Sequence, residues 1–252
     1  NSRIKIFLES EVDAVTGHVG NFKAVVTSPK GSEEIEFGTA IIAVGADVLV
    51  PTGYYHYGEN EKIITQKDLE RMLERGFDAK TVVMIQCVGS RETEGRTYCS
   101  RVCCSEAIKN AINIKKMSLD TEVYVLYKDV RAYGIWETLY NTARSMGVIF
   151  IRYTDEHKPE VDPKNLSVTV NELLLNKKLV LHPDYVVLSS AITPLKDYEK
   201  ISRLFKIPLD TNGFFLEAHV KLRPVDFATD GVFVCGTAHS PKMIYESIAQ
   251  AS

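Results

Sequence analysis

The sequence has no apolar run approaching the roughly 18 residues that a membrane-spanning helix needs. It also has no secretory signal, since a charged N-terminal stretch followed by an apolar segment is missing. Internal repeats and low-complexity segments are absent as well. We therefore expect a cytoplasmic, globular protein that does not itself span a membrane.

Cysteine is scarce, and neither sign of charge dominates. Five cysteines in 252 residues are too few for a disulfide-stabilised scaffold. The 30 Lys and Arg residues against 33 Asp and Glu residues give a net charge of −3, which lacks the basic excess of a nucleic-acid-binding protein. A hydrophobic content of 45% excludes an intrinsically disordered chain.

Both ends of the sequence lack the usual start and stop features. There is no initiator Met, and the chain opens directly on the strand-like alternation of Ile4, Ile6 and Leu8. The last residues, 244–252, form an amphipathic run without a Gly, Asn or Pro stop signal. We interpret the sequence as the middle part of a longer protein.

Hydrophobic periodicity predicts an α/β architecture. Thr65 is expected to cap a helix at 66–75, after N-terminal strands at 12–15, 22–26, 35–37 and 39–44. Strands at 81–86, 122–127 and 148–152 then alternate with helices at 100–117 and 133–146. This order is typical of a parallel sheet with right-handed crossovers. The remaining predicted elements are a meander at 158–182, a buried strand at 184–189, a helix at 195–206, a strand at 230–236 and a helix at 240–252.

The strand at 81–86 and the helix after it have the layout of a nucleotide-binding unit, but its glycines are missing. A dinucleotide fingerprint needs G-x-G-x-x-G so that the backbone can approach a pyrophosphate. Here the loop begins Gln86-Cys87-Val88-Gly89-Ser90, with one glycine in place. We therefore expect a different ligand where a nicotinamide nucleotide would otherwise bind.

Four cysteines fall within 18 positions, with the spacing C-x11-C-x3-C-C over Cys87, Cys99, Cys103 and Cys104. Cys87 ends the predicted strand, and the other three are expected at the start of the helix. These positions share one edge of an α/β sheet, where ligands bind, so the four sulfurs can converge. The electropositive helix N-terminus favours thiolates. Compensating charge can come from Arg91, Arg96, Arg101 and Lys109.

Four thiolates can bind either an iron–sulfur cluster or tetrahedral zinc. The spacing lacks the two C-x2–4-C pairs of structural zinc, and it also differs from the C-x2-C-x2-C run of ferredoxins. A vicinal disulfide or a set of buried free thiols is the remaining alternative. Cys235 lies in a separate predicted strand and is expected to be a small core residue.

Four stretches of the sequence resemble the flavoprotein (A) component of heterodisulfide reductase. They are MIQCVGSR at 84–91, YCSRVCC at 98–104, GFFLEAHVKLRP at 213–224 and GVFVCGTAHSPK at 231–242. The resemblance extends over essentially the whole chain. It implies a two-lobed, thioredoxin-reductase-like α/β fold of the FAD- and NAD(P)-binding type whose first FAD-binding βαβ unit is missing. It also implies that Cys87, Cys99, Cys103 and Cys104 ligate a [4Fe–4S] cluster.

The same resemblance implies FAD as a second cofactor. The candidate flavin contacts are Ala43, Gly45, Ala46, Gly236, Thr237, Ala238 and Lys242. Thr237 replaces an acidic residue of the family pattern, and Lys109 is a further candidate to stabilise reduced flavin by its charge. The pyrophosphate-binding glycines of the family would precede residue 1, so we expect little or no FAD binding by this chain alone.

We expect residues 1–78 and 192–252 to form a discontinuous FAD-binding lobe, and 79–191 to form an NAD-domain-like insert that carries the cluster. The resemblance implies electron transfer between FAD and the cluster, in flavin-based bifurcation or related anaerobic metabolism, with no side chain acting as a general acid or base. The implied partners are other heterodisulfide reductase subunits, ferredoxin, and hydrogenase or formate dehydrogenase components. Two alternatives stay open: an NAD(P)H-dependent disulfide oxidoreductase using Cys103 and Cys104, and a zinc-stabilised interaction module.

Overall fold

The computed structural model describes residues 3–173 and 176–252, which form two compact units. One unit comprises the chain up to Asp47 together with Pro194–Ser252, and the other comprises Val48–Thr193. Residues 1–2 of the predicted first lobe and 174–175 of the predicted meander lie outside the described residues. We call the two parts the split unit and the central unit.

Residues 48–78 belong to the central unit, although they were predicted to belong to the FAD-binding lobe. The reason is a long-range pairing: β6 (Ile63–Thr65) is hydrogen-bonded in parallel to β13 (Tyr185–Ser190). Helix α1 (Gln66–Arg75) follows β6 directly and shares the core of the central unit. The boundary therefore lies well before the predicted one.

A five-stranded parallel sheet forms the centre of the central unit, in the order β6-β13-β7-β8-β9. Its remaining strands are β7 (Thr81–Val88), β8 (Glu122–Tyr127) and β9 (Ile149–Arg152). All the pairings are parallel, as the strand–helix alternation predicts. Strands β7 and β13 are buried over almost their whole length, because a parallel sheet is covered on both faces.

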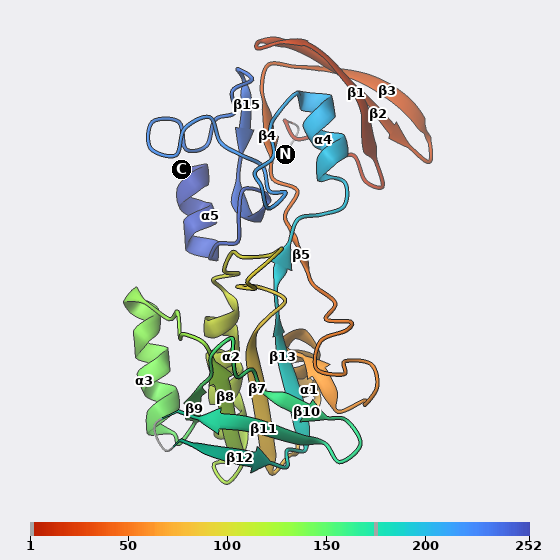
Figure 1. Cartoon of the computed structure of the whole chain (residues 1–252). Coiled ribbons are helices and arrows are strands. Elements are labelled where there is room, and N and C mark those ends of the chain that lie inside the picture. Colours follow the sequence, from red (N-terminus) through yellow and green to blue (C-terminus); the bar gives the residue numbers. More distant parts are fainter. Residues whose placement is uncertain (1–2, 174–175) are drawn as a thin grey trace. The chain divides into compact units, whose positions relative to one another are not determined.

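Helices cover one face of this sheet and a meander covers the other (Figure 1). Val82 and Met84 of β7 share a core with α1, α2 (Cys103–Met117) and α3 (Glu137–Ser145), which follows the 3-10 turn Gly134–Trp136. Val83 and Ile85 share the opposite core with the antiparallel strands β10 (Glu160–Asp162), β11 (Ser167–Glu172) and β12 (Lys177–Leu181). Successive side chains from Val82 to Ile85 thus alternate between the helix side and the meander side.

The split unit contains a three-stranded antiparallel sheet and a short parallel pair of strands. The sheet consists of β1 (Glu11–His18), β2 (Asn21–Ser28) and β3 (Gly31–Phe37). Strand β4 (Ala40–Ile42) pairs in parallel with β15 (Val232–Val234). The helices are α4 (Tyr198–Phe205) and α5 (Ile244–Ala251), and a further 3-10 turn spans Gly236–Ala238. Tyr198, Phe214, Phe215 and Phe227 form a buried aromatic core.

Two short strands, β5 (Asp47–Val48) and β14 (Ile192–Thr193), pair with each other. Over the described ranges 3–173 and 176–252, no helix is both long and apolar enough to cross a membrane.

Two predicted elements are wrong in detail. The described residues 3–10 form no strand, and Ile4, Ile6 and Leu8 are all exposed, so their alternation has no surface to pack against. The helix predicted from residue 100 begins at Cys103. Arg101 has a φ of 60°, which lies in the left-handed region and cannot be part of a right-handed helix.

The N-cap of α1 confirms the prediction made for Thr65 and can be tested directly. Thr65 Oγ1 accepts a hydrogen bond from the backbone N–H of Asp68, and Asp68 Oδ2 accepts one from the backbone N–H of Thr65, each at 3.2 Å. We expect Thr65→Ala to lower the free energy of unfolding by about 1 kcal/mol, measured by urea denaturation. Thr65→Ser should retain nearly all of the stability of the wild type. An unchanged urea midpoint in Thr65→Ala would contradict the role of this cap.

Candidate functional site

Cys87 is located where β7 leaves the regular sheet. Its φ is 61°, a left-handed conformation that residues other than glycine seldom adopt. The ladder between β7 and β13 changes register at the same point, between Leu188 and Ser190. Backbone strain of this kind is concentrated at functional sites. The strained residue here is one of the four cysteines that the sequence singles out.

Cys99 lies in the loop between β7 and α2 and not at the helix start, which corrects the prediction for it. Its sulfur accepts a hydrogen bond from the backbone N–H of Arg101 at 3.3 Å. The loop is held in place by Arg96, whose Nε donates to the carbonyl of Gly89 at 2.6 Å and whose Nη2 donates to the hydroxyl of Tyr54 at 3.2 Å. These contacts fix the part of the chain that carries Cys99.

Cys103 and Cys104 are the first two residues of α2, at the electropositive end of a 15-residue helix. Both are buried, with 3% and 5% of their surface exposed. The hydrogen bond between the two thiols lowers the pKa of Cys104 to about 7 against the effect of burial. The same hydrogen bond, together with burial, raises the pKa of Cys103. Cys104 is therefore the thiol of this pair that ionises more easily.

The four thiols lie within electrostatic range of one another. Burial raises the pKa of Cys87 to about 11, and the neighbouring thiols of Cys104 and Cys99 act in the same direction. The thiols of Cys104, Cys87 and Cys99 likewise raise the pKa of Cys103. The structure thus brings the four cysteines of the C-x11-C-x3-C-C motif into one neighbourhood at the carboxyl edge of the sheet.

Zinc and an iron–sulfur cluster differ in what each requires of the four thiols. In the part of the chain that the structure describes, no three Cys, His, Asp or Glu side chains are arranged to hold one metal ion. Tetrahedral zinc needs four donors about 2.3 Å from one centre. A [4Fe–4S] cluster distributes its cysteine thiolates over separate irons, so it takes a wider set of donors.

Cationic side chains lie near the cysteines, and two of these side chains were not predicted from the sequence. Arg91 was predicted, and its charge lowers the pKa of Cys87 and Cys104. Lys128 acts on Cys87 and Arg131 acts on Cys104 in the same direction. Both follow the end of β8, which lies beside β7 and ends at the same edge of the sheet. This strand order is the signal that could have revealed them.

The other predicted cationic residues have partners of their own. The Arg101 Nη2 donates to the hydroxyl of Tyr133 at 2.7 Å. Lys109, also a candidate for stabilising flavin, lies on α2 and forms an ion pair with Glu70. Its charge is thus partly neutralised within the central unit.

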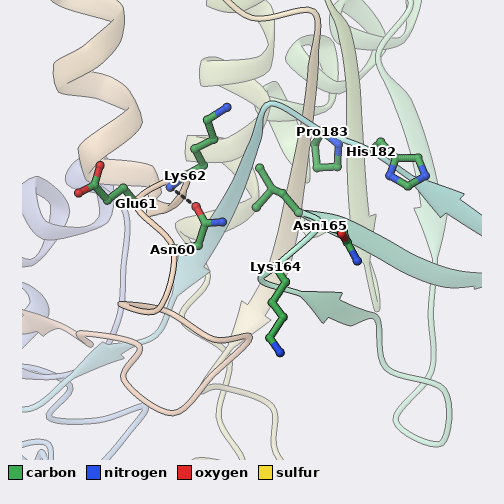
Figure 2. Close-up of a pocket in the computed structure, with 8 residues that line it drawn as sticks. Asn60, Glu61, Lys62, Lys164, Asn165, His182 and Pro183 are labelled. Atoms are coloured by element: carbon green, nitrogen blue, oxygen red, sulfur yellow. Dashed lines mark hydrogen bonds between the residues drawn. The ribbon is translucent and has the colours of Figure 1, made fainter.

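Two of the hollows on the central unit differ in their relation to the cysteines. One, of about 230 Å³, has Cys87 in its wall together with Gly53, Tyr54, Tyr55, Val88, Glu92, Lys128, Tyr153, Lys158 and Pro159. The other, of about 630 Å³, is shown in Figure 2 and is lined by residues 60–62, 164–166, His182 and Pro183. The second hollow contains none of the residues that the sequence predicts for a site, so only the first is connected with the cysteines.

The candidate flavin contacts gather in the split unit. Ala43, Gly45 and Ala46 follow β4, and Gly236–Ala238 follow β15, the strand that is paired with it in parallel. The two segments therefore leave the same sheet edge. Gly45 has a φ of 79°, and a Cβ built on it would lie 3.9 Å from Thr237 Oγ1. The structure thus brings these predicted residues together.

Lys242 is connected to the same turn by a half-buried polar network that was not predicted. Its Nζ lies 2.9 Å from His239 Nδ1 and 2.8 Å from Gln250 Oε1. The Gln250 oxygen also accepts the backbone N–H of Gly236 at 2.9 Å, and His239 Nε2 lies 2.8 Å from Glu217 Oε2. The ammonium of Lys242 is therefore held next to the Gly236 turn.

Cys235 belongs to the split unit and not to the cysteine neighbourhood of the central unit. It is half-buried, and its thiol donates to the carbonyl of Ser247 at 3.6 Å. It is therefore less buried than the small core residue that the sequence predicts, and its thiol has a polar partner in α5.

His239 makes the stability of the split unit dependent on pH. Burial, with the nearby charge of Lys242, lowers the pKa of His239 below 6.5, although Glu217 acts against the shift. The folded state then binds the proton less tightly than the unfolded chain, so stability is full above about pH 6.5 and declines as the pH falls towards the lowered pKa. Urea midpoints from about pH 5 to 8 should show this decline, and His239→Gln should flatten it. An equally steep profile in the variant would contradict the assignment.

No family model matches the chain. Several curated proteins are similar to it in sequence. It is 40% identical over 237 residues to the A subunit of the H(2):CoB-CoM heterodisulfide,ferredoxin reductase of Methanothermobacter thermautotrophicus, covering 87% of this chain and 36% of the relative. It is 40% identical over 238 residues to the iron-sulfur A subunit of the CoB--CoM heterodisulfide reductase of Methanocaldococcus jannaschii, covering 86% and 36%. Identity to the A subunit of the ferredoxin:CoB-CoM heterodisulfide reductase of Methanosarcina acetivorans is 36% over 261 residues, covering 86% and 33%. The chain spans about a third of the length of these relatives.

Solved structures confirm the predicted fold. Thioredoxin reductase of T. acidophilum matches with a TM-score of 0.56 and 14% identity, over 96% of this chain and 69% of that one. Thioredoxin reductase of Lactococcus lactis matches with a TM-score of 0.57 and 16% identity, over 93% and 67%. The fold is therefore α/β and thioredoxin-reductase-like.

Proposed function

This chain is homologous to about a third of the A subunit of heterodisulfide reductase, and on that footing we propose that it transfers electrons between FAD and a [4Fe–4S] cluster as part of an oxidoreductase of that kind. The names of the relatives include ferredoxin, H(2) and formate. The proposed partners are accordingly other heterodisulfide reductase subunits, ferredoxin, and hydrogenase or formate dehydrogenase components. The proposed setting is flavin-based bifurcation or a related anaerobic electron transfer.

The single observation that carries this proposal is the shared neighbourhood of four thiols at the end of β7. Cys87, Cys99, Cys103 and Cys104 would hold the cluster, which when bound supplies one-electron redox chemistry. The start of α2 and the charge of Arg91 offset the negative charge of the thiolates. Burial of the two helix cysteines excludes water from that side of the site.

The split unit would supply the flavin contacts. The residues after β4, Ala43, Gly45 and Ala46, and the 3-10 turn Gly236–Ala238 lie together at one sheet edge, where α/β folds bind ligands. Lys242 would place a positive charge beside this turn, which favours an anionic partner. These residues bind and orient the cofactor, and none of them is required to act as a general acid or base.

The two alternatives have weaker support. A disulfide oxidoreductase would need an accessible nucleophile, because reactive cysteines are partly exposed. Cys103 and Cys104 are both buried. Structural zinc is usually held by two C-x2–4-C pairs, and the C-x11-C-x3-C-C spacing lacks them.

Metal analysis after anaerobic reconstitution separates these functions. We expect about four irons and four sulfides per chain, with little zinc. Cys99→Ser should lose most of the iron, whereas Cys235→Ala, which changes a thiol of the other unit, should keep it. Zinc in place of iron would favour the interaction module. Loss of iron from folded Cys235→Ala would show that a wrong set of four ligands has been assigned.

Calorimetric titration of NADH and NADPH into the cluster-loaded protein tests the remaining alternative. We expect no binding in the micromolar range, because Gly89 is the one glycine of the fingerprint in place and the thiols occupy the edge where phosphates would meet backbone N–H groups. An anionic cluster at that edge would also repel a pyrophosphate. Micromolar binding that is weakened by a charge reversal at Arg91 would instead favour a nicotinamide-dependent enzyme.

A further inference from the structure

Gln86, which directly precedes Cys87, has a buried side-chain amide with no partner among the described residues. The residue is 1% exposed, and neither its Nε2 nor its Oε1 has a hydrogen-bond partner there. Nearly all buried polar groups in native proteins are hydrogen-bonded, so an orphaned amide points to a partner outside the chain. We infer that the Gln86 amide N–H donates to a sulfur of the group that the four cysteines hold, and that it thereby sets the reduction potential of that group.

The position of Gln86 in the sheet directs its side chain towards the start of α2. Val82 and Met84 of β7 share a core with Ala107 of α2, and the alternation of side chains along the strand puts Gln86 on the same face. Helix α2 runs back over β7 as a crossover does, so residues further along β7 lie nearer to its first turn. Gln86 comes two positions after Met84, and Cys103 lies one turn before Ala107. The amide is therefore placed under the end of α2 that carries the helix cysteines.

Several polar groups near Gln86 are hydrogen-bonded to one another. Ser189 is next to Gln86 on the adjoining strand β13, since Leu188 pairs with Ile85. Its Oγ is 3.1 Å from Gln66 Nε2, and the Gln66 oxygen accepts from Asn110 Nδ2 at 2.8 Å. The main-chain carbonyl of Gln86 accepts from the hydroxyl of Tyr153 at 2.7 Å. The side-chain amide of Gln86 does not join these bonds, and Asn110 Oδ1 is also without a partner among the described residues.

Other orphaned groups gather around the same segment. Ser105 follows Cys104, and Ser190 lies opposite Val88 on β13; within the described part of the chain, the hydroxyl oxygens of both serines are buried without a partner. The Nη1 of Arg91 is in the same condition. Such a concentration of unsatisfied groups around the cysteines is what a site built around an additional, acceptor-rich group would show.

The direction of the effect follows from charge. This inference rests on the proposed function, in which the sulfurs carry more negative charge after reduction. A hydrogen bond from a buried amide favours the more negative state, and hydrogen bonds to cluster sulfurs are among the factors that set the potential. The Gln86 N–H should therefore raise the reduction potential, and its removal should lower it.

The test compares Gln86→Met with Gln66→Met. Methionine has a similar shape but no amide, so Gln86→Met should stabilise the metal-free protein against urea, because an unsatisfied polar group is removed. In the loaded protein it should lower the midpoint potential by about 59 mV, which corresponds to about a tenfold change in the one-electron equilibrium. Gln66 is equally buried but is bonded to Ser189 and Asn110. Gln66→Met should therefore destabilise the protein and leave the potential unchanged.

The possible results separate this inference from the proposed function. Wild-type protein that takes up neither iron nor sulfide would refute the function itself. Full iron content with an unchanged potential in Gln86→Met would overturn only the inference, since the amide would then be bound to water. If that variant does not fold, pulsed electron paramagnetic resonance of reduced wild-type protein labelled with ¹⁵N in the glutamine side chain should show a weak nitrogen coupling. Absence of that coupling would equally overturn the inference.

Discussion

The burial of β7 on both faces is the constraint on which the site depends. Val82 and Met84 pack in the core on the helix side, and Val83 and Ile85 pack in the core on the meander side, so the strand has little freedom to shift. At its carboxyl end the ladder with β13 changes register around Cys87, which is in a left-handed conformation, and α2 returns with Cys103 and Cys104 as its first residues. The backbone thus fixes three of the four cysteines, and the hydrogen bonds of the loop place the fourth, Cys99.

The position of residues after parallel strands also accounts for the second group of candidate residues, those expected to contact flavin. In the split unit, the parallel pair of β4 and β15 brings the turns after both strands to one edge, so Gly45 and Thr237 become neighbours. Each unit therefore gathers its candidate residues at the carboxyl ends of parallel strands, where α/β folds bind ligands. The two sites differ in their side chains: the central unit presents thiols among Arg91, Lys128 and Arg131, whereas the split unit presents glycine turns beside Lys242.

Local patterns in the sequence were enough to predict that the central sheet is parallel and that Thr65 caps a helix. They also singled out the four cysteines that lie near one another. What they missed depends on long-range contacts. The boundary at Val48 follows from the pairing of Ile63 with Val186, which are far apart in the chain and have no local signal. The left-handed Arg101 delays the helix by a turn and leaves Cys99 in the loop, and backbone conformations of this kind are not encoded in hydrophobic periodicity.

The central claim is that Cys87, Cys99, Cys103 and Cys104 share one [4Fe–4S] cluster, and Mössbauer spectroscopy of the chain reconstituted anaerobically with ⁵⁷Fe tests it most directly. The technique reports the electronic state of every iron, so it distinguishes a cluster with delocalised valence from iron bound at separate sites. The account predicts a spectrum dominated by the averaged-valence doublets of an oxidised [4Fe–4S] cluster. A spectrum of isolated high-spin ferrous or ferric ions in a correctly folded protein would contradict it.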